Sequence, residues 1–128
     1  MMQKLENLIP KDKFDIETVE LLYGYSFDEL EPIIPRLLEW LQDGNWPVSR
    51  PLGIFLKTMP SDKIAPYIMD ILNGKDFEWK YFVIIILGSG DKSKIDQSFL
   101  DEIKRLAFEP TEIEIKCDLQ EIALLALE

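Results

Sequence analysis

Apolar residues recur every three or four positions along most of the chain, the spacing that places them on one face of an α-helix. Series of this kind cover residues 16–23, 30–41, 52–59, 64–72, 99–106 and 115–126. Each series predicts an amphipathic helix that buries one stripe of side chains. The pattern therefore predicts an all-α protein.

Polar residues and glycines at the ends of these series mark the expected helix boundaries. Ser26 stands three residues before Glu29, and Thr111 three before Glu114, which is the spacing of a capping box. Further N-caps are expected at Asp62, Asp76 and Ser98, and helix ends at Gly24, Gly44, Gly74 and Gly88. Pro51 and Pro66 lie deeper in their expected helices than the first turn, and they predict a bend or a later helix start.

Residues 81–87 form a continuous apolar run that is rich in β-branched and aromatic side chains, as β-strands are. This would be nearly the only strand in the chain, and one strand cannot form a sheet. A helix over residues 77–87, buried on most of its sides, is therefore favoured, with a strand as the alternative.

Two stretches of the chain resemble each other, because each runs from a helix end through a glycine turn to a tryptophan and a second helix. The tryptophans, Trp46 and Trp79, are 33 residues apart, a period typical of solenoids built from two-helix units. The prediction is a HEAT-like α-α superhelix of about six to seven helices. A length of 128 residues suits one domain, residues 1–128.

Acidic residues outnumber basic ones by 24 to 14, which gives a formal net charge of −10. This excess repels phosphate backbones and argues against nucleic-acid binding. Residues 96–128 are the most acidic part, with nine acids against three bases. The charge favours a basic protein partner, or it serves solubility alone.

Residue types that carry much of enzyme chemistry are scarce, since the chain has no histidine and a single cysteine, Cys117. Neither a Ser-His-Asp nor a Cys-His arrangement can form, and a histidine or thiolate zinc site is excluded. Cys117 lies in an apolar-patterned helix and is expected to be a buried, inert thiol. We predict no enzyme activity, no metal and no cofactor.

The sequence also bears on localisation. The opening residues lack the apolar core of a secretory signal, and the longest wholly apolar run, residues 81–87, is too short to span a bilayer. One cysteine cannot form an internal disulfide, so nothing indicates an oxidising compartment. A cytoplasmic protein without membrane contact is expected.

Two loop segments partly match ligand-binding motifs. Residues 88–93 follow an aliphatic run as a phosphate-binding loop does, but Asp91 separates the last glycine from the lysine that should follow it directly. Residues 91–102 have the length of a calcium loop, but Ile95 replaces an oxygen ligand and Asp96 replaces the glycine of the sharp turn. Neither segment predicts a site.

The tryptophan turn, residues 40–47, is the segment that most suggests recognition. Trp46 and Trp79 are expected to pack the starts of adjacent helices together. Tryptophan and arginine are also favoured at binding hot spots, so polar neighbours of these rings are candidates for partner contact. The candidate binding patch consists of Asp43, Asn45, Trp46, Arg50, Trp79 and Lys80.

The same residues carry a family resemblance. Residues 38–48 (LEWLQDGNWPV), with residues 30–35, 79–83 and 8–13, resemble a bacterial family of short proteins classed as a domain of unknown function. The chain departs from that family at Gly44, where most members have methionine. The resemblance covers most of the chain and implies a HEAT-like helical superhelix with no assigned activity and no catalytic residues.

These observations predict a non-catalytic protein-interaction module whose partner is another protein, with basic character. The chain itself is expected to be a monomer or a weak homo-oligomer. One alternative is an immunity or antitoxin protein that neutralises a basic toxin, which the net charge of −10 favours. A hydrolase based on two carboxylates is a lesser alternative, because nothing selects a particular pair.

Overall fold

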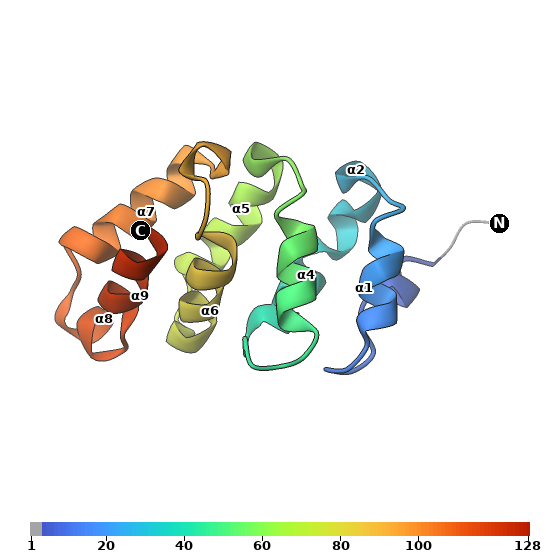
Figure 1. The fold of residues 1–128 in the computed structure, drawn as a ribbon, viewed down its shortest axis with the longest axis horizontal. Helices are drawn as coiled ribbons and strands as arrows, with labels where there is room; N and C mark the ends of the chain where they lie inside the picture. The colour runs from blue at the N-terminus through green and yellow to red at the C-terminus, as the bar shows by residue number, and fades with distance from the viewer. Residues whose placement is uncertain (1–3) are drawn as a thin grey trace.

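The structure, a computed structural model, describes residues 4–128, and this part of the chain is helical without strands (Figure 1). Residues 1–3, which entered the argument against a secretory signal, lie outside the described residues. The α-helices are α1 (Ile16–Leu22), α2 (Phe27–Leu30), α3 (Ile34–Leu38), α4 (Ser49–Leu56), α5 (Ser61–Leu72), α6 (Phe77–Leu87), α7 (Gln97–Phe108), α8 (Glu112–Lys116) and α9 (Leu119–Ala126). Four 3-10 helices accompany them in the described range: η1 (Leu5–Leu8), η2 (Glu31–Ile33), η3 (Glu39–Leu41) and η4 (Lys92–Lys94).

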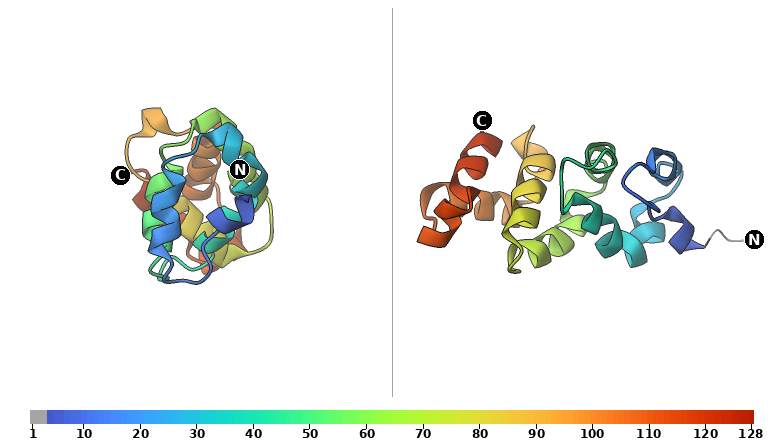
Figure 2. Two further views of the ribbon diagram at one scale, coloured as in Figure 1. Left: turned by 90° about the vertical axis from the view of Figure 1, so that its right-hand side faces the viewer. Right: turned by 90° about the horizontal axis from the view of Figure 1, so that it is seen from below.

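The helices lie in two layers, which Figure 2 shows from the end and from below. Helices α1, α4, α6 and α9 stand side by side in one layer, and α2, α3, α5 and α7 form the other. The chain alternates between the layers, so that α1 and α9 lie at opposite ends of the molecule (Figure 1). Each helix of the first layer packs against its neighbours in that layer, α1 on α4, α4 on α6 and α6 on α9.

The core between the layers consists of the residues that the apolar spacing predicts. Leu37 and Leu41 from the second layer, Leu52 from α4, Ile84 from α6 and Ile103 from α7 have no exposed surface. Most of the helices are covered on one stripe, so the periodicity in the sequence and the pattern of burial coincide, whereas α6 is covered on most of its sides. The prediction of an all-α protein is confirmed for the described residues.

Two of the predicted helices are broken into shorter elements. The series over residues 30–41 is divided among α2, η2, α3 and η3, because Pro32 and Pro35 lack the backbone N–H that a continuous helix needs. The series over residues 115–126 is interrupted at Asp118, whose φ of 66° is left-handed and ends α8 before α9 begins. The described chain therefore has more and shorter helices than the six to seven expected.

The apolar run that resembled a strand is a helix. Helix α6 covers residues 77–87 as predicted, and Asp76 caps it by accepting a hydrogen bond from the backbone N–H of Trp79 at 3.0 Å. Val83 and Ile84 are fully buried between the layers, which accounts for the apolar composition. No helix among residues 4–128 is both long enough and apolar enough to cross a bilayer.

The predicted helix caps are correct in part. Both capping boxes, Ser26 with Glu29 and Thr111 with Glu114, are present. The predictions of N-caps at Asp62 and Ser98 are wrong. Helix α5 begins after Pro60, and the cap of α7 is Asp96, whose carboxylate accepts hydrogen bonds from the backbone N–H and the hydroxyl of Ser98.

Two prolines and the cysteine were also subjects of prediction. Pro66 lies inside α5, and Pro51 is the third residue of α4, within its first turn. Cys117, expected to be buried, is half-buried at the end of α8.

Candidate functional site

The tryptophan turn is held together by a buried serine at the start of α4. The Ser49 hydroxyl has no exposed surface and lies within hydrogen-bond distance of the carbonyl oxygens of Trp40 and Asp43. The N–H of Val48 donates to the carbonyl of Lys13 at 2.9 Å, which fastens the same turn to the segment before α1. The backbone of the turn is thus fixed by its own interior contacts.

The side chains of the turn differ in exposure. Asn45 is exposed, and its N–H donates to the Asp43 carboxylate at 2.8 Å. The ring of Trp46 is half-buried and meets the ring of Trp40 edge to face, with 5.5 Å between centroids. Arg50 is exposed on the first turn of α4. Asn45 and Arg50 therefore stand at the surface beside a tryptophan pair that packs against the core.

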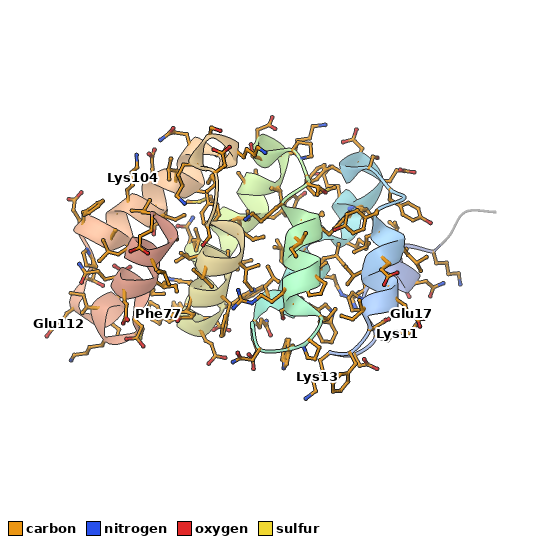
Figure 3. The ribbon with its side chains drawn as sticks, viewed as in Figure 1. Lys11, Lys13, Glu17, Phe77, Lys104 and Glu112 are labelled. Atoms are coloured by element: carbon orange, nitrogen blue, oxygen red, sulfur yellow. The ribbon has the colours of Figure 1, made fainter. Side chains whose placement is uncertain are left out.

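Lys80, the last member of the predicted patch, lies inside the molecule. Only 8% of the Lys80 surface is exposed, and its ammonium group lies 4.5 Å from the centroid of the Phe77 ring. Phe77 is labelled in Figure 3, at the lower end of α6. A cation over an aromatic face is stabilised by the quadrupole of the ring, which explains how a lysine is tolerated there. Lys80 is thus not available at the surface with the other predicted residues.

Trp79 projects toward the second layer. Its indole nitrogen donates a hydrogen bond to the carbonyl oxygen of Leu38, the last residue of α3, at 3.0 Å. The ring forms one wall of a cavity of about 250 Å³, here called the Trp79 cavity, between α3, α5 and the start of α6. Its apolar lining comes from Pro35, Leu38, Tyr67, Ile71 and Trp79.

The polar lining of the Trp79 cavity is mostly acidic. Asp70 and Asp76 contribute carboxylates and Lys75 an ammonium group. The hydroxyl of Tyr67 donates to the Glu31 carboxylate at 2.7 Å, and this hydrogen bond raises the pKa of Tyr67. A third acid thus lies beside the cavity. Aromatic faces next to carboxylates attract cations, so this arrangement can bind a positively charged side chain.

Sequence reasoning identified Trp79 but missed Tyr67 and Asp70. Tyr67 shares a face of α5 with Asp70, three residues later, and with Ile71, four residues later, so the helical spacing contained a signal. It did not indicate that this face meets Trp79, because that depends on how α5 packs against α3 and α6. The structure brings Trp79 to Tyr67 and Asp70 in one cavity, rather than to the predicted residues of the tryptophan turn.

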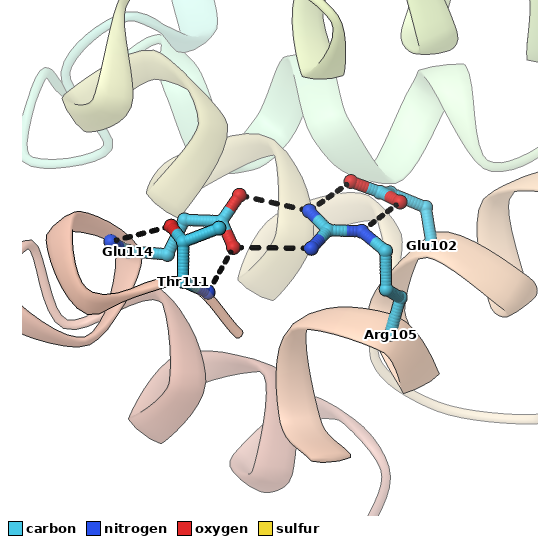
Figure 4. Close-up of polar contacts among 4 residues, drawn as sticks. All are labelled: Glu102, Arg105, Thr111 and Glu114. Atoms are coloured by element: carbon cyan, nitrogen blue, oxygen red, sulfur yellow. Dashed lines mark hydrogen bonds and ion pairs between the residues drawn. The ribbon is translucent and has the colours of Figure 1, made fainter. Parts of the chain in front are cut away.

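A second polar cluster joins α7 to α8 (Figure 4). The Arg105 guanidinium donates two hydrogen bonds to Glu102 and two to Glu114, at distances between 2.8 and 3.1 Å. These contacts raise the pKa of Arg105, and Arg105 lowers the pKa of Glu114 to about 2. Glu114 is therefore held ionised, and Arg105 bridges it to Glu102 in a clamp that suits a structural role.

The comparisons with known proteins concern the chain as a whole. No curated protein matches it. A family model described as "Domain of unknown function (DUF5071)" matches residues 8–127, nearly the full length. The resemblance to a family of unknown function is thereby confirmed. The chain belongs to the DUF5071 family.

Proposed function

We propose that this chain is a non-catalytic protein-interaction module, that its two layers form a HEAT-like superhelix, and that its partner is a basic protein. The superhelix is supported by the alternation of helices between layers and by packing between successive helices. Solenoids of this kind present long surfaces on which other proteins bind.

The Trp79 cavity is the observation that carries the proposal. Two aromatic rings, Tyr67 and Trp79, lie with Asp70 and Asp76 around about 250 Å³. An arginine or lysine side chain fits this chemistry, because its aliphatic stem packs on the apolar wall while its cationic end reaches the carboxylates and the ring faces. Lys75 is the one base in the lining, against the two carboxylates of Asp70 and Asp76.

The charge of the whole chain supports the same partner. A formal net charge of −10 draws basic surfaces toward the module and repels acidic ones, including nucleic acids. Long-range attraction speeds association, whereas the cavity supplies the specific contact. We therefore place an arginine or lysine of the partner in the Trp79 cavity.

Peptide binding tests this proposal. Basic peptides of about 12 residues would be screened by calorimetry, and the best binder compared with a version in which citrulline, an uncharged isostere, replaces one arginine at a time. We expect one such replacement to weaken binding about tenfold or more, which is the effect of a buried charge contact. Asp70→Asn should weaken binding of the parent peptide similarly but leave the affinity of that citrulline version unchanged.

The matched control is Asp62→Asn, on the same helix but outside the cavity. It makes the same change in net charge and should alter affinity less than twofold. Equal losses from Asp70→Asn and Asp62→Asn would contradict the proposal, because binding would then depend on net charge alone. An absence of binding by any basic peptide would also contradict it.

The immunity-protein function is a second candidate, and the net charge of −10 is the observation that favours it. In this case the basic partner would be a toxin or nuclease, which the chain would bind and neutralise. A toxin gene beside the gene for this chain, together with inhibition of that toxin by the purified protein, would support it. Unrelated neighbouring genes would count against it.

A further inference from the structure

A second cavity lies on another part of the molecule, between the end of α4, the first half of α5 and the segment from Gly88 to the start of α7. It encloses about 320 Å³, within the range of small-molecule sites. We call it the Ser89 cavity. Its apolar wall includes Leu56, Ile64, Ala65, Ile68, Leu87 and Phe99, all of them core residues.

The mouth of the Ser89 cavity carries two lysines and a helix start. Lys57 and Lys94 line it, and the Lys57 ammonium donates to the carbonyl of Ser89 at 2.8 Å, which leaves it further hydrogens to donate. Ser61, the first residue of α5, also lines it, and Pro60 before it has no side chain that can cap the helix. The backbone N–H groups at the start of α5 therefore favour an anion.

Two aspartates also line this cavity, and both are engaged elsewhere. Asp91 accepts hydrogen bonds from the N–H and hydroxyl of Ser93, at 3.0 and 2.7 Å. Asp96 accepts from the N–H and hydroxyl of Ser98, at 3.0 and 2.6 Å. Each carboxylate thus caps its own helix, η4 or α7, while Lys57 and Lys94 bring two positive charges to the same mouth.

Ser89 has an unsatisfied polar atom at this site. Its hydroxyl oxygen is buried and has no hydrogen-bond partner among the described residues. Buried hydroxyl groups are nearly always paired, so an unpaired one beside a cavity indicates a missing partner. A ligand in the cavity can supply it only if the Ser89 side chain turns toward the cavity, because the oxygen has essentially no accessible surface.

We infer that the Ser89 cavity binds an amphiphile with an apolar tail and a carboxylate head, of the size of a medium-chain fatty acid. The tail packs among Ile64, Ile68 and Phe99, and the carboxylate lies at the mouth near Lys57 and Lys94. This site is separate from the Trp79 cavity and does not depend on the proposed interaction with a basic protein.

Calorimetry with octanoate, octanol and octylammonium tests the inference on the full chain. We expect octanoate to bind at least tenfold more tightly than either other molecule, because only octanoate offers an anion to the lysines. Lys57→Met should weaken octanoate binding about fivefold or more. The matched control is Lys104→Met. Lys104 is exposed on α7 (labelled in Figure 3) and does not line the cavity, so this substitution should have less than a twofold effect.

A variant of the apolar wall tests the location. Ala65→Met adds volume inside the cavity and should remove octanoate binding, with a thermal melt as the check on folding. Amide shift changes on adding octanoate should centre on residues 56–65 and 87–99, and this readout remains if Ala65→Met fails to fold. Equal binding of all three molecules, equal effects of the two lysine variants, or shift changes centred elsewhere would each overturn the inference. So would the absence of any binding.

Discussion

The indole nitrogen of Trp79 donates a 3.0 Å hydrogen bond to the carbonyl oxygen of Leu38, 41 residues earlier in the chain. Leu38 is the last residue of α3 and the residue directly before η3. One side chain thus ties α6 to α3 and also forms a wall of the Trp79 cavity. A stabilising contact and the proposed binding site meet at this residue, and removing the whole ring would disturb both.

Trp79→Phe separates the two roles, because it keeps an aromatic ring and removes the donor. We expect the free energy of unfolding to fall by about 0.5–1.5 kcal/mol, the net contribution of one hydrogen bond. Trp79→Ala should cost more, about 3 kcal/mol, since packing is also lost. Urea denaturation measures both. Equal stability of wild type and Trp79→Phe would show that the bond to Leu38 contributes nothing.

Ser49→Ala tests whether the tryptophan turn is fastened from within. The Ser49 hydroxyl is buried against the carbonyls of Trp40 and Asp43, so its loss should lower the free energy of unfolding by about 1–3 kcal/mol. Ser98→Ala removes an exposed hydroxyl and should cost about 0.5 kcal/mol or less. Thermal melts of the two variants give the comparison. Equal costs would mean that these buried contacts do not fasten the turn.

Gly44 lies against the ring of Phe82, and a Cβ at residue 44 would stand 2.3 Å from Cδ1 of that ring. Gly44→Ala should therefore destabilise the fold by about 1–3 kcal/mol through overpacking. The same substitution in a Phe82→Ala background should cost much less, because the ring is gone. A double-mutant cycle by chemical denaturation measures this coupling. Additive effects would show that the contact is not what excludes a side chain at residue 44.

The Arg105 clamp predicts a dependence of stability on pH. The pKa of Glu114 is lowered from 4.5 to about 2, so its ionised form is stabilised by folding. The contribution is fully present above the unfolded pKa and is lost as the pH falls through the folded pKa. Glu114→Gln should therefore cost about 2 kcal/mol at pH 7, and the difference from wild type should shrink between pH 4.5 and pH 2.

The control for this prediction is Glu112→Gln. Glu112 is exposed on the same helix, at the outer edge in Figure 3. Its substitution by glutamine changes the net charge by the same amount as Glu114→Gln. Glutamine at residue 114 can still complete the capping box with Thr111, so the comparison isolates the contact with Arg105. Glu112→Gln should change the stability by about 0.5 kcal/mol or less at any pH. A cost for Glu114→Gln that is the same at pH 2 and pH 7 would contradict the assigned role.

The sequence by itself determined the features that neighbouring residues decide. The capping box of Ser26 and Glu29 and the extent of α6 followed from short-range hydrogen bonds and apolar spacing, which act within one or two turns. The interruptions of the predicted helices at Pro35 and Asp118 also have local causes. The prediction missed them because the apolar spacing continues through both positions. At Pro35 that spacing conflicts with the missing backbone N–H, and the structure shows that the missing N–H prevails.

Only the tertiary structure decided which helix faces meet. The meeting of Trp79 with Tyr67 and Asp70 depends on the way α6 packs against α3 and α5, whereas the contact of Lys80 with Phe77 lies within one turn of α6. Side chains far apart in the sequence come together through the crossing of helices, and helical periodicity carries no information on that crossing. The sequence thus determined which residues share a face of one helix, and packing decided which faces share a cavity.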